Sequence, residues 1–286
     1  MDIQNTLREL DAIFKSGEHH RIEPFLVEHL RQAEAEGDKP SMLSLQNELM
    51  GYYRALSRFR EALELGEKAL SLLESMGYKG SVPYATTLLN VATAYRAEGQ
   101  VQKAIGMYEE VMQIYTANKL EDVYLTASLY NNLSLAYQEA GQHEKAIELL
   151  DRAMPLVRSL PESAVHVATT HTNRGLSEIR CGRFAAARED LQAALAIYEA
   201  GHTGSSHYAG ALAGMGEVAF REKQPQESIG FYERALQEIA GHYGKQNLYY
   251  AVTLDSLAVV YEDLDKPKSE ALAAEAQQIR EAVKQA

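Results

Sequence analysis

Histidine, cysteine and carboxylate side chains are the groups in this sequence that could bind a metal ion or attack a substrate. A helix presents zinc ligands only when they share one face, and no His-x-x-x-His pair occurs among the nine histidines. His166 and His171 are five residues apart, which fits one helical face poorly. Cys181, the one cysteine, has no base and orienting partner nearby in the sequence. We therefore predict no metal, no cofactor and no catalytic residue.

Binding loops for nucleotides and nucleophile elbows for acyl transfer leave short signatures in a sequence. The sequence contains no Gly-x-x-x-x-Gly-Lys-Ser/Thr loop, no Gly-x-Ser-x-Gly elbow and no Gly-x-Gly-x-x-Gly fingerprint. The formal net charge of −12 disfavours contact with phosphate backbones, and no cluster of Lys and Arg stands out. We predict that the protein is not an enzyme and does not bind nucleic acid.

The elements that must position any binding residues repeat along the chain. A turn position recurs at intervals of 41 or 42 residues, at Ser57, Gly99, Gly141, Gly182, Lys223 and Asp265. Around each turn, apolar and small residues follow the i, i+3, i+4 spacing of a helix, so each unit is predicted to be two helices. Alanines at Ala104, Ala146 and Ala187 would let the paired helices approach closely. Since one pair cannot bury both of its faces, the units are expected to stack.

The pattern Asn-Leu-x-x-x-Tyr-x-x-x-Gly-x-x-x-x-Ala-Ile, found at residues 132–147, resembles the tetratricopeptide repeat (TPR). The longer period is similar to that of the kinesin light chain subgroup. The resemblance covers residues 41–286 and implies an all-α, right-handed superhelix, an α-solenoid of six helix pairs. The approximate repeats are 41–80, 81–122, 123–164, 165–205, 206–247 and 248–286.

Residues 1–40 match the repeat poorly and are predicted to form a divergent helical pair that caps the array. Gly210, Gly214 and Gly216 lie in the first helix of the fifth repeat, where each costs up to about 1 kcal/mol relative to alanine. Close packing, local flexibility and a hinge are all compatible with these glycines. The role of this glycine-rich helix stays open at this point.

In TPR proteins the first helices of the repeats line a concave groove that holds a peptide or a partner helix. By resemblance, Asn90, Asn132 and Asn173 match the recurring groove asparagine, whose amide can both donate and accept a hydrogen bond. The same helical face is expected to carry Thr86, Arg96, Asn131, Gln138, Glu139, Thr169 and Arg180. Two interpretations are open, because these amides could hold a ligand or could only connect neighbouring helices.

Tyrosines are the remaining candidates for contact with a partner. Tyr53, Tyr95 and Tyr137 recur at one repeat position, as a core residue would, and Tyr261 shares that position. Tyrosines outside this register are expected at the surface, namely Tyr130, Tyr249 and Tyr250.

These patterns predict a non-catalytic protein–protein interaction module that binds a peptide or helix of a partner. No apolar run is long enough to span a bilayer, and the N-terminus lacks a secretory signal, so we expect a cytoplasmic location and no membrane contact. A homo-oligomeric structural scaffold and a peptide-responsive regulatory protein are the alternative interpretations.

Overall fold

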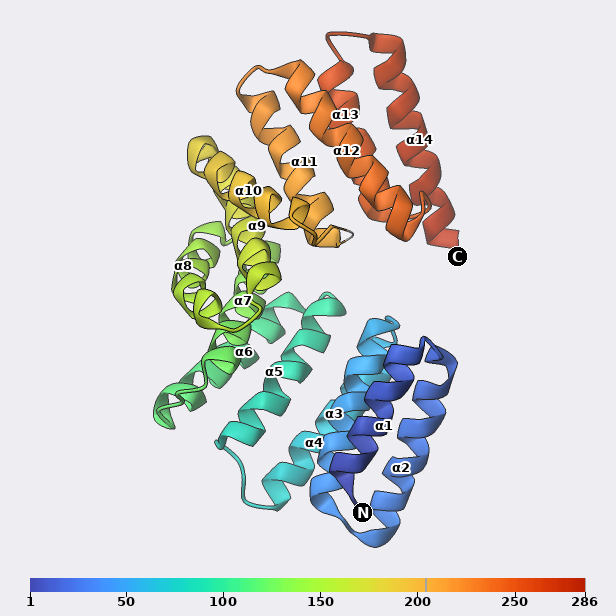
Figure 1. Cartoon of the computed structure of the whole chain (residues 1–286), viewed down its shortest axis with the longest axis vertical. Coiled ribbons are helices and arrows are strands. Elements are labelled where there is room, and N and C mark those ends of the chain that lie inside the picture. Colours follow the sequence, from blue (N-terminus) through green and yellow to red (C-terminus); the bar gives the residue numbers. More distant parts are fainter. Residues whose placement is uncertain (204, 286) are drawn as a thin grey trace. The chain divides into compact units, whose positions relative to one another are not determined.

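The chain folds into helices that follow one another in antiparallel pairs (Figure 1). The computed structural model describes residues 1–203 and 205–285, with the side chains of residues 284 and 285 excepted. Every regular element in these residues is a helix, which confirms the predicted all-α class. The chain divides into two compact units, Met1–Ala140 and Gly141–Ala286, and each is described by itself.

The first unit holds the helices that carry most of the predicted groove residues. In chain order they are α1 (Ile3–Ser16), the 3-10 helix η1 (His19–Arg21), α2 (Ile22–Glu36), α3 (Lys39–Ala55), α4 (Phe59–Ser75), α5 (Val82–Ala97), α6 (Val101–Ala117) and α7 (Val123–Glu139). The helices α3, α5 and α7 are the first helices of successive pairs. They form one layer of the unit, because side chains of α3 hydrogen-bond α5 and a side chain of α5 pairs with α7.

The second unit continues the same alternation. Its helices are α8 (His143–Ser159), α9 (Ala164–Arg180), α10 (Phe184–Glu199), α11 (Ser206–Arg221), α12 (Pro225–Tyr243), α13 (Leu248–Tyr261) and α14 (Lys266–Gln285). None of the helices in the described residues combines the length and the apolar composition that a membrane span requires. The division into numbered repeats behind a cap at residues 1–40 stays a prediction.

Most of the first helices begin at a residue whose side chain accepts a backbone hydrogen bond. Asp38 accepts from the N–H of Ser41 at 3.2 Å, and Asp122 accepts from the N–H of Leu125 at 2.9 Å. Ser81 caps α5 in the same way. These residues satisfy N–H groups that the first turn of a helix leaves unpaired. The loops between pairs therefore determine where each first helix starts.

The turn inside each pair is made by one residue in the left-handed region. Gly141 has a φ of 73°, and the same position is occupied by Lys223 with a φ of 63°. Glycine adopts this conformation without a steric penalty, whereas lysine does not. Ser57, Gly99 and Gly182 also have positive φ, so the predicted turn position is confirmed in these five pairs. Asp265 is the exception, because the last turn contains one extra residue.

The contact between the two helices of a pair is built on small residues. Ala62, Ala104, Ala146 and Ala187 each lie five residues after the turn and are completely buried. Ser228 occupies this position in α12, where its hydroxyl donates to the carbonyl of Gly216 at 2.8 Å. A larger side chain here would hold the helices apart, so the expectation of close approach is confirmed for Ala104 and Ala187, whose helix pairs each lie within one unit.

A tyrosine of each first helix in the first unit connects it to the second helix of the preceding pair. The hydroxyl of Tyr95 donates to Glu67 at 2.8 Å, and the hydroxyl of Tyr137 donates to Glu109 at 2.7 Å. Tyr53 forms the equivalent bond with Glu23 on α2 at 3.0 Å. The three rings are buried, as predicted for a core position. Each ring thus contributes apolar area while its hydroxyl remains hydrogen-bonded.

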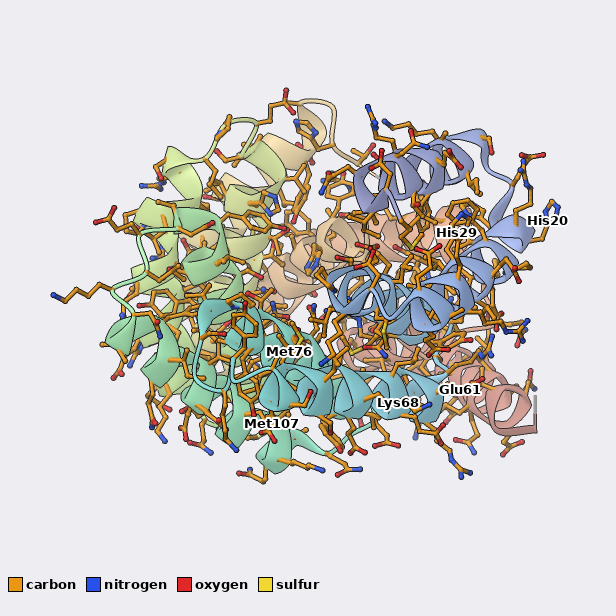
Figure 2. All side chains as sticks on the ribbon, turned by 90° about the horizontal axis from the view of Figure 1, so that it is seen from below. His20, His29, Glu61, Lys68, Met76 and Met107 are labelled. Carbon is orange, nitrogen blue, oxygen red and sulfur yellow. The ribbon has the colours of Figure 1, made fainter. Side chains whose placement is uncertain are left out.

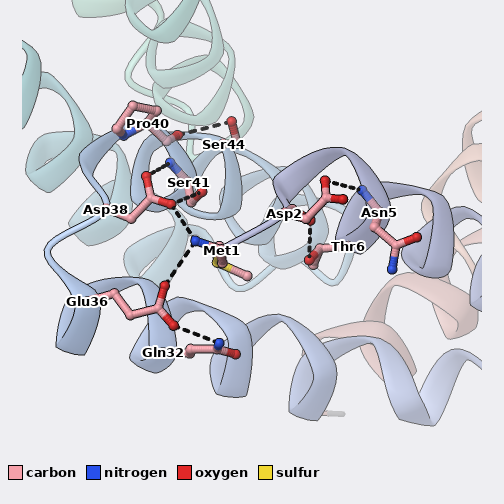
Figure 3. Close-up of polar contacts among 10 residues, drawn as sticks. All are labelled: Met1, Asp2, Asn5, Thr6, Gln32, Glu36, Asp38, Pro40, Ser41 and Ser44. Carbon is pink, nitrogen blue, oxygen red and sulfur yellow. Dashed lines mark hydrogen bonds and ion pairs between the residues drawn. The ribbon is translucent and has the colours of Figure 1, made fainter.

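The helices α1 and α2 precede this regular array. Leu10 and Ile13 of α1 are buried, while most of the other residues of α1 are exposed. The α-amino group of Met1 forms ion pairs with Glu36 at 2.9 Å and with Asp38 at 3.0 Å (Figure 3). Because Asp38 also caps α3, these contacts connect the start of α1 to the junction between α2 and α3.

One face of α4 is charged and exposed. Lys68, labelled in Figure 2, is exposed, whereas Ala62 of the same helix is completely buried. This agrees with the amphipathic pattern of a helix that packs on one face only.

Close packing accounts for two of the three glycines in α11. A methyl group at Gly216 would lie 3.0 Å from three ring atoms of Tyr232, and one at Gly214 would lie 3.0 Å from Leu176 and Leu191. Only Gly210 has ordinary space, with its nearest neighbour 4.0 Å away. Gly214 and Gly216 therefore let α11 approach its neighbours.

The same constraint generates a stability prediction at Gly66 in α4. A methyl group there would lie 2.5 Å from Cγ2 of Val91 and 2.9 Å from the sulfur of Met50. We expect Gly66→Ala to lower the free energy of unfolding by about 1–3 kcal/mol, because Val91 is a stiff core residue. Gly106→Ala is the matched control, since nothing lies within 4 Å of that position. It should raise the free energy of unfolding by up to about 1 kcal/mol in urea titrations. An equal effect of the two substitutions would contradict the packing account.

Candidate functional site

The candidate site is the face of α3, α5 and α7 that carries the predicted groove residues of the first unit. We call it the groove face and define it by Ser44, Asn47, Arg54, Thr86, Asn90, Arg96, Asn131, Asn132, Gln138 and Glu139. These side chains are half-buried except for Glu139, which is exposed. Packing of the helices therefore fixes where each side chain begins, and its polar end stays accessible to solvent.

Two asparagines connect α3 to α5 at the centre of the groove face. The Nδ2 of Asn90 donates to Oδ1 of Asn47 at 3.3 Å, and Asn47 donates to Oγ1 of Thr87 at 3.3 Å. Asn47 also donates to the carbonyl of Leu43 at 3.0 Å. The amide of Asn90 therefore braces two helices, and its Oδ1 accepts no hydrogen bond from the described residues. Asn90 could both connect the helices and bind a ligand, because its NH₂ group is bonded to Asn47 while its oxygen can still accept a hydrogen bond.

The asparagines of α7 bond their own helix. Nδ2 of Asn132 donates to the carbonyl of Ser128 at 2.9 Å, and Nδ2 of Asn131 donates to the carbonyl of Ala127 at 3.0 Å. Each bond runs to the residue four positions earlier, so the side chain lies along the helix surface. Asn132 also donates to Oγ of Ser128 on the same helix at 3.4 Å, whereas Asn90 bonds to a neighbouring helix.

A hollow of about 290 Å³ lies between α3 and α5, next to the asparagine pair. Its lining combines apolar groups with short hydroxyl side chains and consists of Leu43, Ser44, Asn47, Leu73, Val82, Pro83, Thr86 and Thr87. The hydroxyl of Thr86 donates to the carbonyl of Val82 at 3.0 Å, which turns its methyl group toward the surroundings of the hollow. A small apolar side chain flanked by a peptide group fits this mixture of surfaces.

Charged side chains occupy the other end of the groove face. Arg96 of α5 forms an ion pair with Glu139 of α7, and Arg96 is the more buried partner. Gln138, beside Glu139, lies at the repeat position of Arg96. The sequence predicted these residues on one face, and the structure brings Arg96 and Glu139 into contact.

The remaining three predicted residues lie on α9 in the second unit. Oγ1 of Thr169 lies 3.4 Å from the hydroxyl oxygen of Tyr198, and Arg180 is exposed with Glu217 at 3.7 Å. Asn173 is only 3% exposed, so its side chain offers little surface to a ligand. The recurring groove asparagine is therefore half-buried in α5, as Asn90, and buried in α9, as Asn173.

A buried polar cluster on α9 and α10 is the main feature that the sequence reasoning missed. Nδ1 of His171 lies 2.7 Å from Oδ1 of Asp190, and Arg174 donates to both oxygens of Asp190 at 2.6 Å. Arg174 also donates to Asp151 on α8 at 2.6 Å. Glu178 completes the cluster at the repeat position that tyrosine occupies in the first unit. The available signal was the spacing of Arg174 and Glu178, three and seven residues after His171, but the partner Asp190 lies on another helix.

The two carboxyl groups of Glu178 and Asp190 have pKa values that are shifted in opposite directions. Burial, followed by the charge of Asp190, raises the pKa of Glu178 to about 7, while Arg174 acts in the opposite direction. Hydrogen bonds from Arg174 and His171 outweigh burial at Asp190 and lower the pKa of that carboxyl. His171 and Asp190 are both buried, and the hydrogen bonds of Arg174 and His171 connect α8, α9 and α10.

The cysteine and histidine candidates show no activated arrangement. Burial, and then a hydrogen bond to Glu144, raise the pKa of the Cys181 thiol, whereas a nucleophilic cysteine has a lowered pKa. No group of three or more His, Cys, Asp or Glu side chains in the described residues could hold a metal ion. Among the tyrosines expected at the surface, Tyr249 is 72% exposed and Tyr130 is half-buried. The expectation for Tyr250 is wrong, because this residue of α13 is buried in a core cluster with residues of α12 and α14.

Comparison with known families addresses the repeat directly. A family model described as tetratricopeptide repeat matches residues 83–159 and 207–282, and a second model of that description matches residues 167–202. The chain belongs to the tetratricopeptide repeat family. The predicted resemblance to TPR proteins and the helical-repeat solenoid class are thereby confirmed. No curated protein sequence matches this TPR chain.

Solved structures share the fold of this TPR protein at low identity. BtubC (BKLC) from P. vanneervenii has a TM-score of 0.58 and 20% identity, covering 81% of this chain and 91% of that chain. The apo form of RapI has a TM-score of 0.65 and 15% identity, covering 97% and 76%. NprR in complex with its cognate peptide NprX has a TM-score of 0.65 and 15% identity, covering 96% and 78%. At these identities the similarity concerns the fold.

The raised pKa of Glu178 generates a pH prediction. A carboxyl whose folded pKa is near 7, above its unfolded value of about 4.5, favours the folded state most at low pH. This contribution is present below pH 4.5 and is lost as the pH rises through 7. Glu178→Gln should remove it, so the variant gains roughly 1–3 kcal/mol over the wild type between pH 5 and pH 8.

The measurement is the free energy of unfolding in urea at several pH values for both proteins. A difference that stays constant from pH 5 to pH 8 would show that Glu178 does not titrate in this range.

Proposed function

We propose that this TPR protein is a non-catalytic interaction module that binds an extended peptide or a helix of a partner protein on the groove face. The ligand would lie across α3, α5 and α7, with a small apolar side chain in the hollow beside Thr86 and a backbone N–H on Oδ1 of Asn90. The partner is a protein or peptide, with no role for nucleic acid or a membrane. We assign this function to the cytoplasm.

The observation that carries the proposal is the hollow between α3 and α5 with its adjoining asparagine pair. The hollow offers apolar surface, and Asn90 offers an acceptor that no described residue uses. Asn47, which itself donates to Thr87, accepts from the amide of Asn90 and so orients its oxygen before a ligand arrives. A preformed site loses little conformational entropy on binding.

The fold supports a peptide ligand. NprR, which shares the fold at a TM-score of 0.65, was solved in complex with its cognate peptide NprX. That similarity indicates that the fold can hold a peptide. The residues of the groove face are the reason for proposing that this chain does so. A peptide-responsive regulator is the form of this proposal that NprR suggests.

A substitution that fills the hollow tests the proposal. Peptides selected by display from an unbiased library on the wild type should lose at least about tenfold in affinity for Thr86→Phe, because the ring occupies the hollow. Gln113→Phe is the matched control, since Gln113 is exposed on α6, outside the groove face. It should bind the same peptides as tightly as the wild type in titration calorimetry. Equal affinity of Thr86→Phe and wild type would contradict this location.

A second candidate function, self-association, is favoured by one observation in the second unit. Tyr249, Val252 and Val259 lie on one face of α13 and are 72%, 58% and 51% exposed. Contiguous exposed apolar groups on a helix mark an interaction surface. A second copy of the chain could cover this face, which would make the protein a homo-oligomeric scaffold.

Sedimentation velocity over a range of concentrations tests this second function. If α13 mediates association, the wild type should form a dimer at high concentration, and Val252→Glu should shift it to monomer, because a charge would be buried in the interface. Gln278→Glu adds a charge at an exposed position of α14 and should leave the dimer intact. A wild type that stays monomeric at every concentration would exclude this function.

A further inference from the structure

Gln46 of α3 places an amide at a position of the repeat that is occupied mostly by apolar residues. Gln46 is 4% exposed, and its Oε1 is buried and accepts no hydrogen bond from the described residues. Leucine fills the matching position in three later first helices, as Leu88 of α5, Leu212 of α11 and Leu254 of α13, and all three are buried. A buried amide oxygen without a donor costs free energy that leucine avoids.

Another repeat carries a polar side chain at this position, and there the chain supplies its partner. His171 occupies the position in α9, and its Nδ1 lies 2.7 Å from Oδ1 of Asp190 on α10. The residue of α4 that matches Asp190 is Leu65, which has no polar side-chain atom. The hydrogen-bond partner of Oε1 of Gln46 therefore has to come from solvent or from a ligand.

Gln46 lines a hollow of about 580 Å³ whose other lining residues come from α2, α3 and α4. We call this hollow the outer hollow. A helix turns by about 100° per residue, so Met42 and Gln46 share a face of α3 that differs from the face of Ser44 and Asn47. No residue lines both the outer hollow and the hollow between α3 and α5. The outer hollow is therefore separate from the groove face.

The lining of the outer hollow combines apolar surface with carboxylates. Met42 and Leu72 supply apolar surface, and three carboxylates stand against one lysine, namely Glu34, Glu64, Glu67 and Lys68. Two of the carboxylates already have partners, because Glu64 pairs with Arg60 at 3.3 Å and Glu67 accepts from Tyr95 at 2.8 Å.

Glu34 of α2 is the carboxylate of the outer hollow that is free to meet a ligand. It is exposed, and neither Glu34 nor Lys68 forms an ion pair or a hydrogen bond with a described residue. The excess of carboxylates over lysine makes the outer hollow attractive to a cation. The free acceptor of Gln46 adds a requirement for a hydrogen-bond donor at the buried end of that cation.

We propose that the outer hollow binds an arginine side chain of a partner protein, with Oε1 of Gln46 accepting from its guanidinium and Glu34 facing its charge. The apolar stem of arginine matches Met42 and Leu72. The five donors of a guanidinium can reach Gln46 and still hold a carboxylate through two parallel hydrogen bonds, which the compact ammonium of lysine cannot do. This site goes beyond the proposed peptide-binding function, because it lies on another face of α3.

Gln46→Leu tests the proposal, because it installs the residue that three other repeats carry at this position. An unbiased peptide library is selected on wild type and on Gln46→Leu in parallel. We expect wild type to select a set of peptides enriched in arginine, and Gln46→Leu to bind this set at least about tenfold more weakly. The urea midpoint of Gln46→Leu should rise, because the unpaired buried oxygen is gone. A fall of the midpoint would assign the amide a structural role and overturn the proposal.

A second pair of variants tests the charge of the outer hollow. Glu34→Gln should weaken binding of the arginine peptides at low salt, because the free carboxylate is lost. Glu28→Gln makes the same change at an exposed position of α2 that does not line the outer hollow, and it should leave their affinity unchanged. Peptides with citrulline in place of arginine keep the stem but lose the charge, so they should bind wild type more weakly. Equal binding of the citrulline and arginine peptides would overturn the role of the cation.

The groove variant Thr86→Phe separates this inference from the proposed function. Peptides of the outer hollow should bind Thr86→Phe as tightly as wild type, because Thr86 does not line the outer hollow. Arginine peptides that lose affinity for Thr86→Phe and keep it for Gln46→Leu would place their site on the groove face and overturn the inference. Absence of an arginine-enriched set would overturn it too. Free arginine amide that displaces the peptides at their own concentration would make the ligand a small molecule and contradict a protein partner.

Discussion

The close approach of the two helices in each pair is the contact on which the rest of the structure depends. Completely buried alanines such as Ala62 and Ala104, five residues after a left-handed turn, allow this approach. A fixed separation within pairs makes the pairs equivalent, so the first helices of a unit form a regular layer. Residues about 42 positions apart then become neighbours. The bonds from Asn90 to Asn47 and from Arg96 to Glu139, each spanning 43 residues, follow from this regularity.

Much of the fold could be predicted because the same local sequence pattern occurs once in each repeat. The turn at Gly141 needs a residue tolerant of positive φ, and the same interval located Ser57 and Lys223, whose residue types alone would not mark a turn. Tyr250 was placed wrongly because exposure was judged from its absence in the tyrosine register. Its burial depends on the packing of α13 against α12 and α14, which no local pattern reports.

The candidate site was less predictable for a specific physical reason. Asn90 was expected on the groove face, yet its partner Asn47 lies one residue before the matching position, which Glu48 occupies. A helix places adjacent residues about 100° apart, so only the structure shows which of the two faces α5.

The two units use different polar chemistry at one repeat position. Tyr53, Tyr95 and Tyr137 connect helices by a neutral hydroxyl that donates to a glutamate, which costs little when the hydroxyl stays bonded. In the second unit Glu178 takes this position, and Arg174 makes the connection between α8 and α9. Burial raises the pKa of Glu178 to about 7, so this position of the second unit is expected to respond to pH near neutrality.

The central claim is that the groove face of α3, α5 and α7 receives a peptide, and side-chain amide NMR tests it most directly. The side-chain NH₂ signals of Asn47, Asn90 and Gln113 are followed while a peptide selected on wild type is added. The account predicts saturable shifts for Asn47 and Asn90 and none for Gln113 on α6. Shifts confined to Gln113 and its neighbours, with Asn47 and Asn90 unchanged at saturation, would contradict it.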